Sequence, residues 1–121
     1  FRFNRRFPQN TVTALRLAIQ AGPAIAPLSH ALYRAMWVDD RDLQDEATLR
    51  ALVAAQGLDA DALLAGAATP AVKQALFEST AAAIAAGVFG APTTVAKVPG
   101  AADQLFWGQD RLELVTDALC A

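Results

Sequence analysis

The stretch GVFGAPTTVAKV, residues 87–98, contains the change from helical to extended character in this sequence. Gly87 follows a long alanine-rich run and is a typical helix end, and a β-branched segment begins at Thr93. Pro92 stands between the two. Because proline cannot donate a ladder hydrogen bond, it belongs at a sheet edge, at a strand's first residue or at a bulge. The sequence therefore predicts a strand over 93–98 that Pro92 opens.

The residues after this strand predict a hairpin and a final helix. PGAAD at 99–103 is a turn sequence, and QLFW at 104–107 gives a second short strand. Gly108 then precedes an amphipathic segment, 109–119, in which Leu112, Val115 and Leu119 share a face. An isolated hairpin is marginal in water, and the strand at 93–98 has the pattern of one covered on both faces. We therefore expect it to need further neighbours.

Helix caps and stops divide the sequence before Gly87 into five predicted helices. Their starts are, in order, Asn10 as a cap, a position near Pro27, Asp45 and Asp59 as caps, and Thr69-Pro70. Helical spacing predicts the buried residues of the first three, which are Val12, Leu15 and Ile19, then Leu28, Leu32 and Ala35, then Leu49, Leu52 and Val53.

Composition excludes several classes of protein. The 121 residues, 55% hydrophobic and 18% charged, fit one globular domain. The net charge of −2 gives no general attraction to nucleic acid, and the apolar stretches are too short for a membrane span. A single cysteine, Cys120, excludes an internal disulfide, and a single histidine, His30, excludes a metal site with two histidines. The basic cluster Arg2, Arg5 and Arg6 is interpreted as a solvated loop.

The string GVFGAPTTVAKV, the turn and LFWGQDRLELV resemble the C-terminal part of the kappa-class glutathione transferases and the bacterial 2-hydroxychromene-2-carboxylate isomerases. These enzymes belong to the DsbA-like branch of the thioredoxin fold. FRFNRRFPQNTVTALRLA resembles the segment that leads into their helical domain, and TPAVKQALFESTAAAIAAGVFGAP the long helix that returns to the sheet. The resemblance implies an α/β, thioredoxin-like fold, with 1–87 as an inserted all-α domain and its lead-in loop. Residues 88–121 would form the C-terminal strand–strand–helix half.

The same resemblance implies a glutathione site. Ala91-Pro92 occupies the place of the cis peptide whose main chain binds the cysteinyl part of glutathione, as an added strand would. Gln109 and Asp110 occupy the place of the pair that contacts the γ-glutamyl end. The residues themselves leave alternatives open. Pro92 as a trans residue opening an edge strand is one, and Asp110 as an acidic residue that complements the helix dipole is another.

For the complete protein the resemblance implies glutathione-dependent isomerisation of 2-hydroxychromene-2-carboxylate, in aromatic catabolism, with glutathione as cofactor. The alternatives are a kappa-type glutathione transferase, a non-catalytic thioredoxin-like module that binds an extended peptide, and a purely structural helical domain. We expect a small aromatic substrate, a homodimer, a cytoplasmic location, and no nucleic-acid or membrane partner. The thiol-activating serine of the family precedes the segment matched by Phe1, so we expect a C-terminal portion without turnover of its own.

Other candidate residues are weaker. His30, beside Tyr33 and Trp37 on one predicted helix, is interpreted as a packed or surface residue rather than a catalyst. Cys120 lies near a helix C-terminus, where the dipole opposes thiolate formation. The aromatic residues Phe1, Phe3 and Phe7 either line an apolar pocket or pack half-buried. No catalytic residue is assigned from this sequence.

Overall fold

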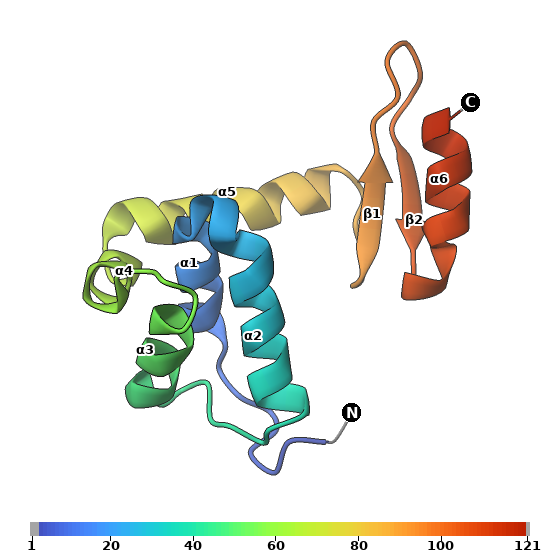
Figure 1. Ribbon diagram of the computed structural model, residues 1–121. Coiled ribbons are helices and arrows are strands. Elements are labelled where there is room, and N and C mark those ends of the chain that lie inside the picture. Colours follow the sequence, from blue (N-terminus) through green and yellow to red (C-terminus); the bar gives the residue numbers. More distant parts are fainter. Residues whose placement is uncertain (1–2, 121) are drawn as a thin grey trace. The chain divides into compact units, whose positions relative to one another are not determined.

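A computed structural model describes residues 3–120 of the chain (Figure 1). Its helical part contains α1 (Val12–Gln20), the short 3₁₀ helix η1 (Gly22–Ala24), α2 (Ile25–Trp37), α3 (Glu46–Ala54), α4 (Ala60–Ala67) and α5 (Pro70–Ala85). The strands β1 (Thr93–Ala96) and β2 (Gln104–Trp107), the 3₁₀ helix η2 (Gln109–Arg111) and α6 (Leu112–Cys120) follow.

The chain divides into two compact units, Phe1–Phe77 and Glu78–Ala121, which we call the helical unit and the hairpin unit. The division falls inside α5, whereas the sequence predicts a boundary between 87 and 88. The assignment of 1–87 to an inserted domain, and of 88–121 to half of a thioredoxin-like domain, stays a prediction.

Aspartates cap two helices of the helical unit, as the sequence predicts. Asp45 accepts hydrogen bonds from the N–H groups of Ala47 and Thr48, at 3.3 and 3.0 Å, and from the Thr48 hydroxyl at 2.7 Å. The bonds from Thr48, side chain first, lower the pKa of the Asp45 carboxyl. Asp59 accepts from the N–H of Ala62 at 3.0 Å. Each aspartate therefore satisfies main-chain donors that its helix leaves unpaired.

The starts of α1 and α2 differ slightly from the prediction. The cap position of α1 is held by Thr11 rather than Asn10, although the Asn10 side chain accepts from the N–H of Val12 at 3.0 Å. Helix α2 begins at Ile25, before Pro27, because the 3₁₀ turn of η1 runs directly into it.

Helix α5 begins and ends where the sequence predicts a start and a stop. Pro70 is its first residue, and the Thr69 hydroxyl accepts from the N–H of Val72 at 3.4 Å. Beyond its end Gly87 has a φ of +82°, a conformation that glycine adopts without strain, and its N–H donates to the carbonyl of Ile84.

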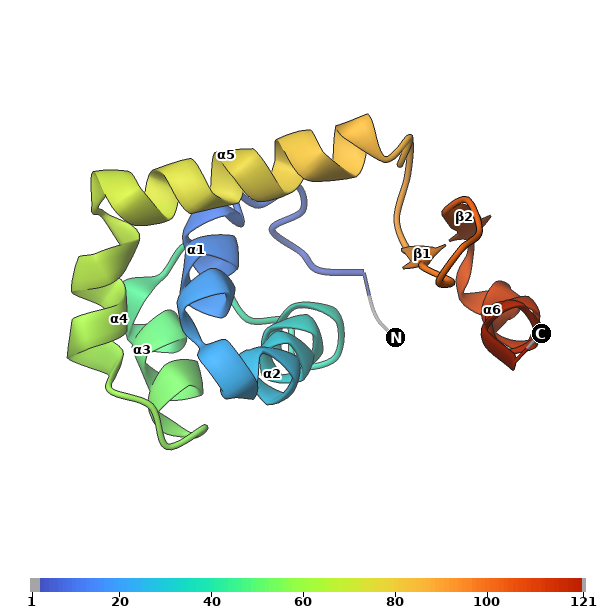
Figure 2. The same cartoon turned by 90° about the horizontal axis from the view of Figure 1, so that it is seen from above.

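The buried face of α1 is not the one that the sequence predicts. Val12 and Leu15 are 39% and 48% exposed, and the buried residues are Ala14, Leu17 and Ala18. Small alanine side chains let neighbouring helices approach closely, and α1 contacts both α2 and α4. Figure 2 shows α1 between these two helices.

The core of the helical unit is aliphatic. Its largest fully buried side chains are Leu17, Leu28 and Val53, from α1, α2 and α3. The predicted core residues of α2 and two of the three predicted for α3 are buried, and the third, Leu52, packs partly buried against them. This apolar burial is the main source of the unit's stability.

Asn4 attaches the N-terminal segment to the end of α2. It is 3% exposed, and its side-chain N–H group donates to the carbonyls of Met36 and Arg41 at 3.0 and 2.9 Å. Its side-chain oxygen accepts from the main-chain N–H of Arg6 and from Gln9 Nε2, both at 2.8 Å. One buried side-chain amide therefore attaches the N-terminal segment to main-chain atoms more than thirty residues away in sequence.

The predicted basic cluster is a solvated loop as far as the structure describes it, since Arg2 lies outside the described residues. Arg5 Nε lies 2.6 Å from Asp40 Oδ2, and Arg6 Nε lies 3.7 Å from Asp42 Oδ2. The two arginine side chains are 75% and 53% exposed. The Arg6–Asp42 pair, in which both side chains are partly exposed, contributes little to stability, whereas the Asp40 side chain that pairs with Arg5 is only 8% exposed.

The hairpin unit contains the end of α5, then β1, β2, η2 and α6. The strands pair antiparallel, with Thr93 opposite Trp107 and Ala96 opposite Gln104. Strand β1 ends at Ala96, short of the predicted Val98, and α6 packs against it. Ala96 and Val115 are buried, whereas the exposed residues of α6 include Leu112 and Leu119, which the sequence places on the apolar face. Among residues 3–120, every helix is too short or too polar to cross a lipid bilayer.

Candidate functional site

The turn before β1 has an accessible main chain. The peptide bond between Ala91 and Pro92 is cis, the geometry that the resemblance implies at this position. Both residues are exposed, and the N–H and C=O of Ala91 make no hydrogen bond within the described residues. The Thr93 hydroxyl donates to the carbonyl of Gly90 at 2.6 Å and closes the turn. Ala91 is therefore available to an extended peptide-like ligand.

A main-chain hydrogen bond brings the two predicted motifs together. The N–H of Gly108 donates to the carbonyl of Pro92 at 2.9 Å, one step beyond the last pair of the strand register. The predicted residues Ala91, Pro92, Gln109 and Asp110 therefore lie at the same end of the hairpin. Gly108 has a φ of +115°, which a residue with a Cβ atom adopts only under strain.

Asp110 presents an accessible carboxylate. It lies in η2 with Gln109, and both are exposed. A Cβ atom at Gly108 would overlap Asp110 Oδ1, so the carboxylate is folded back over that glycine. Arg111 Nε lies 3.8 Å from Asp110 Oδ2, and both side chains are more than half exposed, so this ion pair is weak. The carboxylate can pair with an ammonium group, and the Gln109 amide can donate or accept.

An indole ring flanks the turn, which the sequence analysis did not predict. A Cβ atom at Gly90 would lie 2.9 Å from Trp107 Nε1, so only glycine fits against the indole as it stands. The rings of Phe89 and Trp107 are 5.4 Å apart and largely exposed. A glycine two residues before the proline that opens one strand, with a tryptophan at the end of the paired strand, is the signal that could have indicated this contact.

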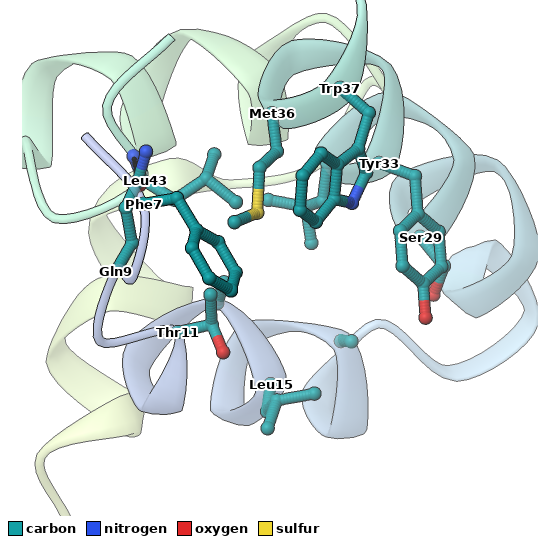
Figure 3. Close-up of a pocket in the computed structure, with 12 residues that line it drawn as sticks. Phe7, Gln9, Thr11, Leu15, Ser29, Tyr33, Met36, Trp37 and Leu43 are labelled. Atoms are coloured by element: carbon teal, nitrogen blue, oxygen red, sulfur yellow. Dashed lines mark hydrogen bonds between the residues drawn. The ribbon is translucent and has the colours of Figure 1, made fainter. Parts of the chain in front are cut away.

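The helical unit contains an apolar pocket of about 320 Å³ (Figure 3). In Figure 3, Tyr33, Met36 and Trp37 come from α2 and Leu15 from α1, and the ring of Phe7 points into the space between the two helices. The rings of Phe7 and Trp37 are 5.9 Å apart. Few polar atoms line the pocket, so its wall is mostly apolar. Such a pocket suits a flat, apolar group.

The three predicted N-terminal phenylalanines have different outcomes. Phe7 lines the pocket, which favours the first of the two predicted alternatives for this residue. Phe3 stacks edge to face on Phe7, with ring centroids 5.0 Å apart, and is 64% exposed. Phe1 lies outside the described residues. The peptide bond between Phe7 and Pro8 is also cis, a second such bond that the sequence analysis did not predict.

The remaining candidates lie on the surface. His30 and Cys120 are exposed, and neither lines the pocket of Figure 3, although Tyr33 does. Among residues 3–120, no three side chains of the types His, Cys, Asp and Glu gather as a metal site would require. No nucleophile or base is assigned among the described residues.

Comparisons with known proteins agree on one family. The sequence model of the DSBA-like thioredoxin domain matches residues 1–120. Glutathione S-transferase kappa 1 of Rattus norvegicus is 32% identical over 120 residues, covering 93% of this chain and 53% of the relative. The protein of the same name from Homo sapiens is 38% identical over 94 residues, covering 75% and 41%. The 2-hydroxychromene-2-carboxylate isomerase of Sphingobium xenophagum is 36% identical over 89 residues, covering 74% and 43%.

The matches to these three relatives cover only part of each relative's length. The chain spans about half the length of the curated relatives it matches. The family match, by contrast, covers almost every residue, including both motifs at the end of the hairpin. This chain therefore belongs to the DSBA-like thioredoxin domain family and has the DsbA-like thioredoxin fold.

Proposed function

We propose that the complete protein binds glutathione and uses its thiolate to isomerise 2-hydroxychromene-2-carboxylate. The observation that supports the proposal is the hydrogen bond from the Gly108 N–H to the Pro92 carbonyl, because it joins the two segments to which the resemblance assigns glutathione contacts. One motif offers a free main chain and the other an accessible carboxylate. Glutathione carries groups that complement both, a peptide-like centre and a charged γ-glutamyl end.

In this proposal the cysteinyl part of glutathione lies along Ala91 as an added strand, with hydrogen bonds to its main-chain N–H and C=O. The ammonium of the γ-glutamyl end pairs with the Asp110 carboxylate. Its carboxylate lies at the N–H groups where η2 leads into α6, and the Gln109 amide donates to it. The ligand is then bound through main-chain hydrogen bonds along its cysteinyl part and through both charged groups of its γ-glutamyl end.

The proposed reaction consumes no glutathione. The thiolate adds to the chromene ring, the ring carbon–oxygen bond opens, a carbon–carbon bond rotates, and the thiolate leaves again. Its proton must be removed before addition and returned afterwards, which requires a thiol-activating group. We propose that this group belongs to the part of the relatives' length that the chain does not match.

A kappa-type glutathione transferase is the second candidate. Two of the matching relatives carry that name, and one of them covers 93% of the chain. In this case the thiolate attacks an electrophile and remains in the product. A non-catalytic module that binds an extended peptide would use the same turn before β1. The homodimer and the cytoplasmic location stay predictions.

Calorimetry on the complete protein tests the glutathione site. The Asp110→Asn variant should bind glutathione about 10- to 150-fold more weakly, because a hydrogen bond to a charged group contributes about 1.5–3 kcal/mol. Glu113→Gln is the matched control. Glu113 is an exposed acidic residue like Asp110, and it lies nearby in the first turn of α6. Cysteinylglycine, which lacks the γ-glutamyl ammonium, should bind the Asp110→Asn variant and the wild type equally. Unchanged glutathione affinity in Asp110→Asn would contradict the site.

Product analysis separates the two enzymatic candidates. With chromene carboxylate, the isomerase returns glutathione unchanged and gives the ring-opened isomer. With chlorodinitrobenzene, a transferase gives a stable glutathione conjugate. The 121-residue chain alone should give neither product. Turnover by the chain comparable to that of the complete protein would refute the proposal and would direct attention to Tyr33, His30 and Cys120.

A further inference from the structure

The helical unit has a second pocket, of about 310 Å³, which the proposed function does not use. Residues of α1, of the start of α3, of the end of α4 and of the start of α5 line it. Two of these residues are cations, Arg16 and Lys73. We call this cavity the Arg16 pocket. Its volume lies at the lower end of the range for small-molecule sites.

Arg16 has a buried donor without an acceptor. Its Nε atom is buried, and no hydrogen bond to it is formed within the described residues. The guanidinium also has no ion-pair partner there, unlike those of Arg5, Arg34 and Arg50. A buried N–H donor without an acceptor is unfavourable, and proteins normally supply one. The unpaired Nε therefore leaves a donor for an acceptor from outside the described residues.

The charge balance of the pocket favours an anion. Lys73 makes no ion pair among residues 3–120, and the only carboxylate in the lining, that of Glu46, already accepts from Arg50 Nη2 at 2.9 Å. Arg50 also pairs with Asp61, and these contacts, that with Asp61 first, raise the pKa of its guanidinium. Because Arg50 is shared by two carboxylates, the group of Glu46, Arg50 and Asp61 carries one net negative charge. The lining residues Arg16, Lys73 and Glu46 therefore carry a net charge of +1, which one monovalent anion would balance.

The rest of the lining limits the kind of anion. Thr13 and Gln44 offer a hydroxyl and an amide that can donate hydrogen bonds. Leu49 and Ala67 are buried apolar wall residues, and Leu64 packs beside them. A ligand that complements this pocket has a carboxylate for the cations and a short apolar body for the wall.

We propose that the Arg16 pocket binds a small monocarboxylic acid as its anion, with the carboxylate on Arg16 and Lys73 and the apolar body against Leu49 and Leu64. The site is separate from the glutathione site, because every residue of its lining belongs to the helical unit. Its occupancy stabilises the helical unit, since a ligand that binds only the folded state raises the free energy of unfolding.

A nuclear magnetic resonance titration of this chain with hexanoate tests the proposal. Hexanoate should give saturable shifts in the amide signals of Thr13, Arg16, Gln44 and Lys73, whereas 1-hexanol, the neutral analogue, should give none that saturate. Raising the salt concentration should weaken the binding, because the lysine is exposed to solvent.

Three variants distinguish this site from binding elsewhere. Arg16→Gln and Lys73→Gln should each raise the hexanoate dissociation constant about tenfold or more, the loss expected for one charged hydrogen bond. Arg34→Gln removes the same charge from α2, outside the pocket, and should leave it unchanged. Because Lys73 is exposed, its variant retains the fold even where Arg16→Gln does not. No saturable shift with hexanoate, or equal affinity in Lys73→Gln and Arg34→Gln, would overturn the proposal.

Discussion

Replacing Asn4 by alanine should destabilise the helical unit by about 2–3 kcal/mol. The four hydrogen bonds of the Asn4 side chain do not count equally. The Arg41 carbonyl keeps its bond from Gln9 Nε2 at 3.1 Å, and the N–H of Arg6, an exposed residue, can bind water instead. The carbonyl of Met36, a residue that is 8% exposed, loses the partner that Asn4 provides.

The magnitude follows from this inventory. A buried acceptor left without a partner costs about 1–3 kcal/mol, and each bond that water or another group partly replaces costs about 0.5 kcal/mol or somewhat more. The summed loss of about 2–3 kcal/mol corresponds to a fall of about 1–2 M in the midpoint of urea unfolding for a small protein.

Fluorescence of a single tryptophan measures this change in the helical unit alone. In a Trp107→Phe background, Trp37 is the remaining tryptophan, and its ring lies 5.9 Å from those of Phe3 and Phe7. Asn10→Ala serves as the control, because Asn10 is exposed and makes one bond, to the N–H of Val12. An Asn4→Ala midpoint equal to that of Asn10→Ala would refute the reasoning.

Two further predictions concern the turn and a helix cap. Gly108→Ala should destabilise the hairpin unit by about 1–3 kcal/mol and displace Asp110, so that glutathione affinity falls. Gly100→Ala, also at positive φ but in open space, should lose stability without losing glutathione affinity in calorimetry. Equal glutathione affinities of Gly108→Ala and Gly100→Ala would contradict this prediction. Because the pKa of Asp45 is lowered by folding, its stabilisation is present above about pH 4 and is lost as the pH falls further. Wild type should therefore lose more stability than Asp45→Asn, which keeps a cap, between about pH 5 and 2 in urea titrations, and parallel curves would exclude this effect.

The elements that could be predicted from the sequence are those determined by local chemistry. Asp45, Asp59 and Gly87 act within one turn of their own positions, so their roles follow from a few neighbouring residues. The cis geometry at Pro92 rested on a resemblance rather than on such a local rule.

What could not be predicted depends on residues that are distant in sequence. The buried face of α1 is set by how closely α2 and α4 approach Ala14 and Ala18, and hydrophobic spacing alone favoured Leu15. In the candidate site, the sequence indicated Asp110 but not the contact of Trp107 with Gly90, because strand register decides which residues face each other.

The bond between Gly108 and Pro92 joins main-chain atoms only, and this affects how the site can be altered by mutation. Side-chain substitutions at 91, 109 and 110 leave both of its atoms in place. A randomised library at these three positions could therefore explore new ligand selectivities on a conserved backbone. Divergent sequences could likewise exchange their recognition residues by single steps, each intermediate retaining the geometry of the turn.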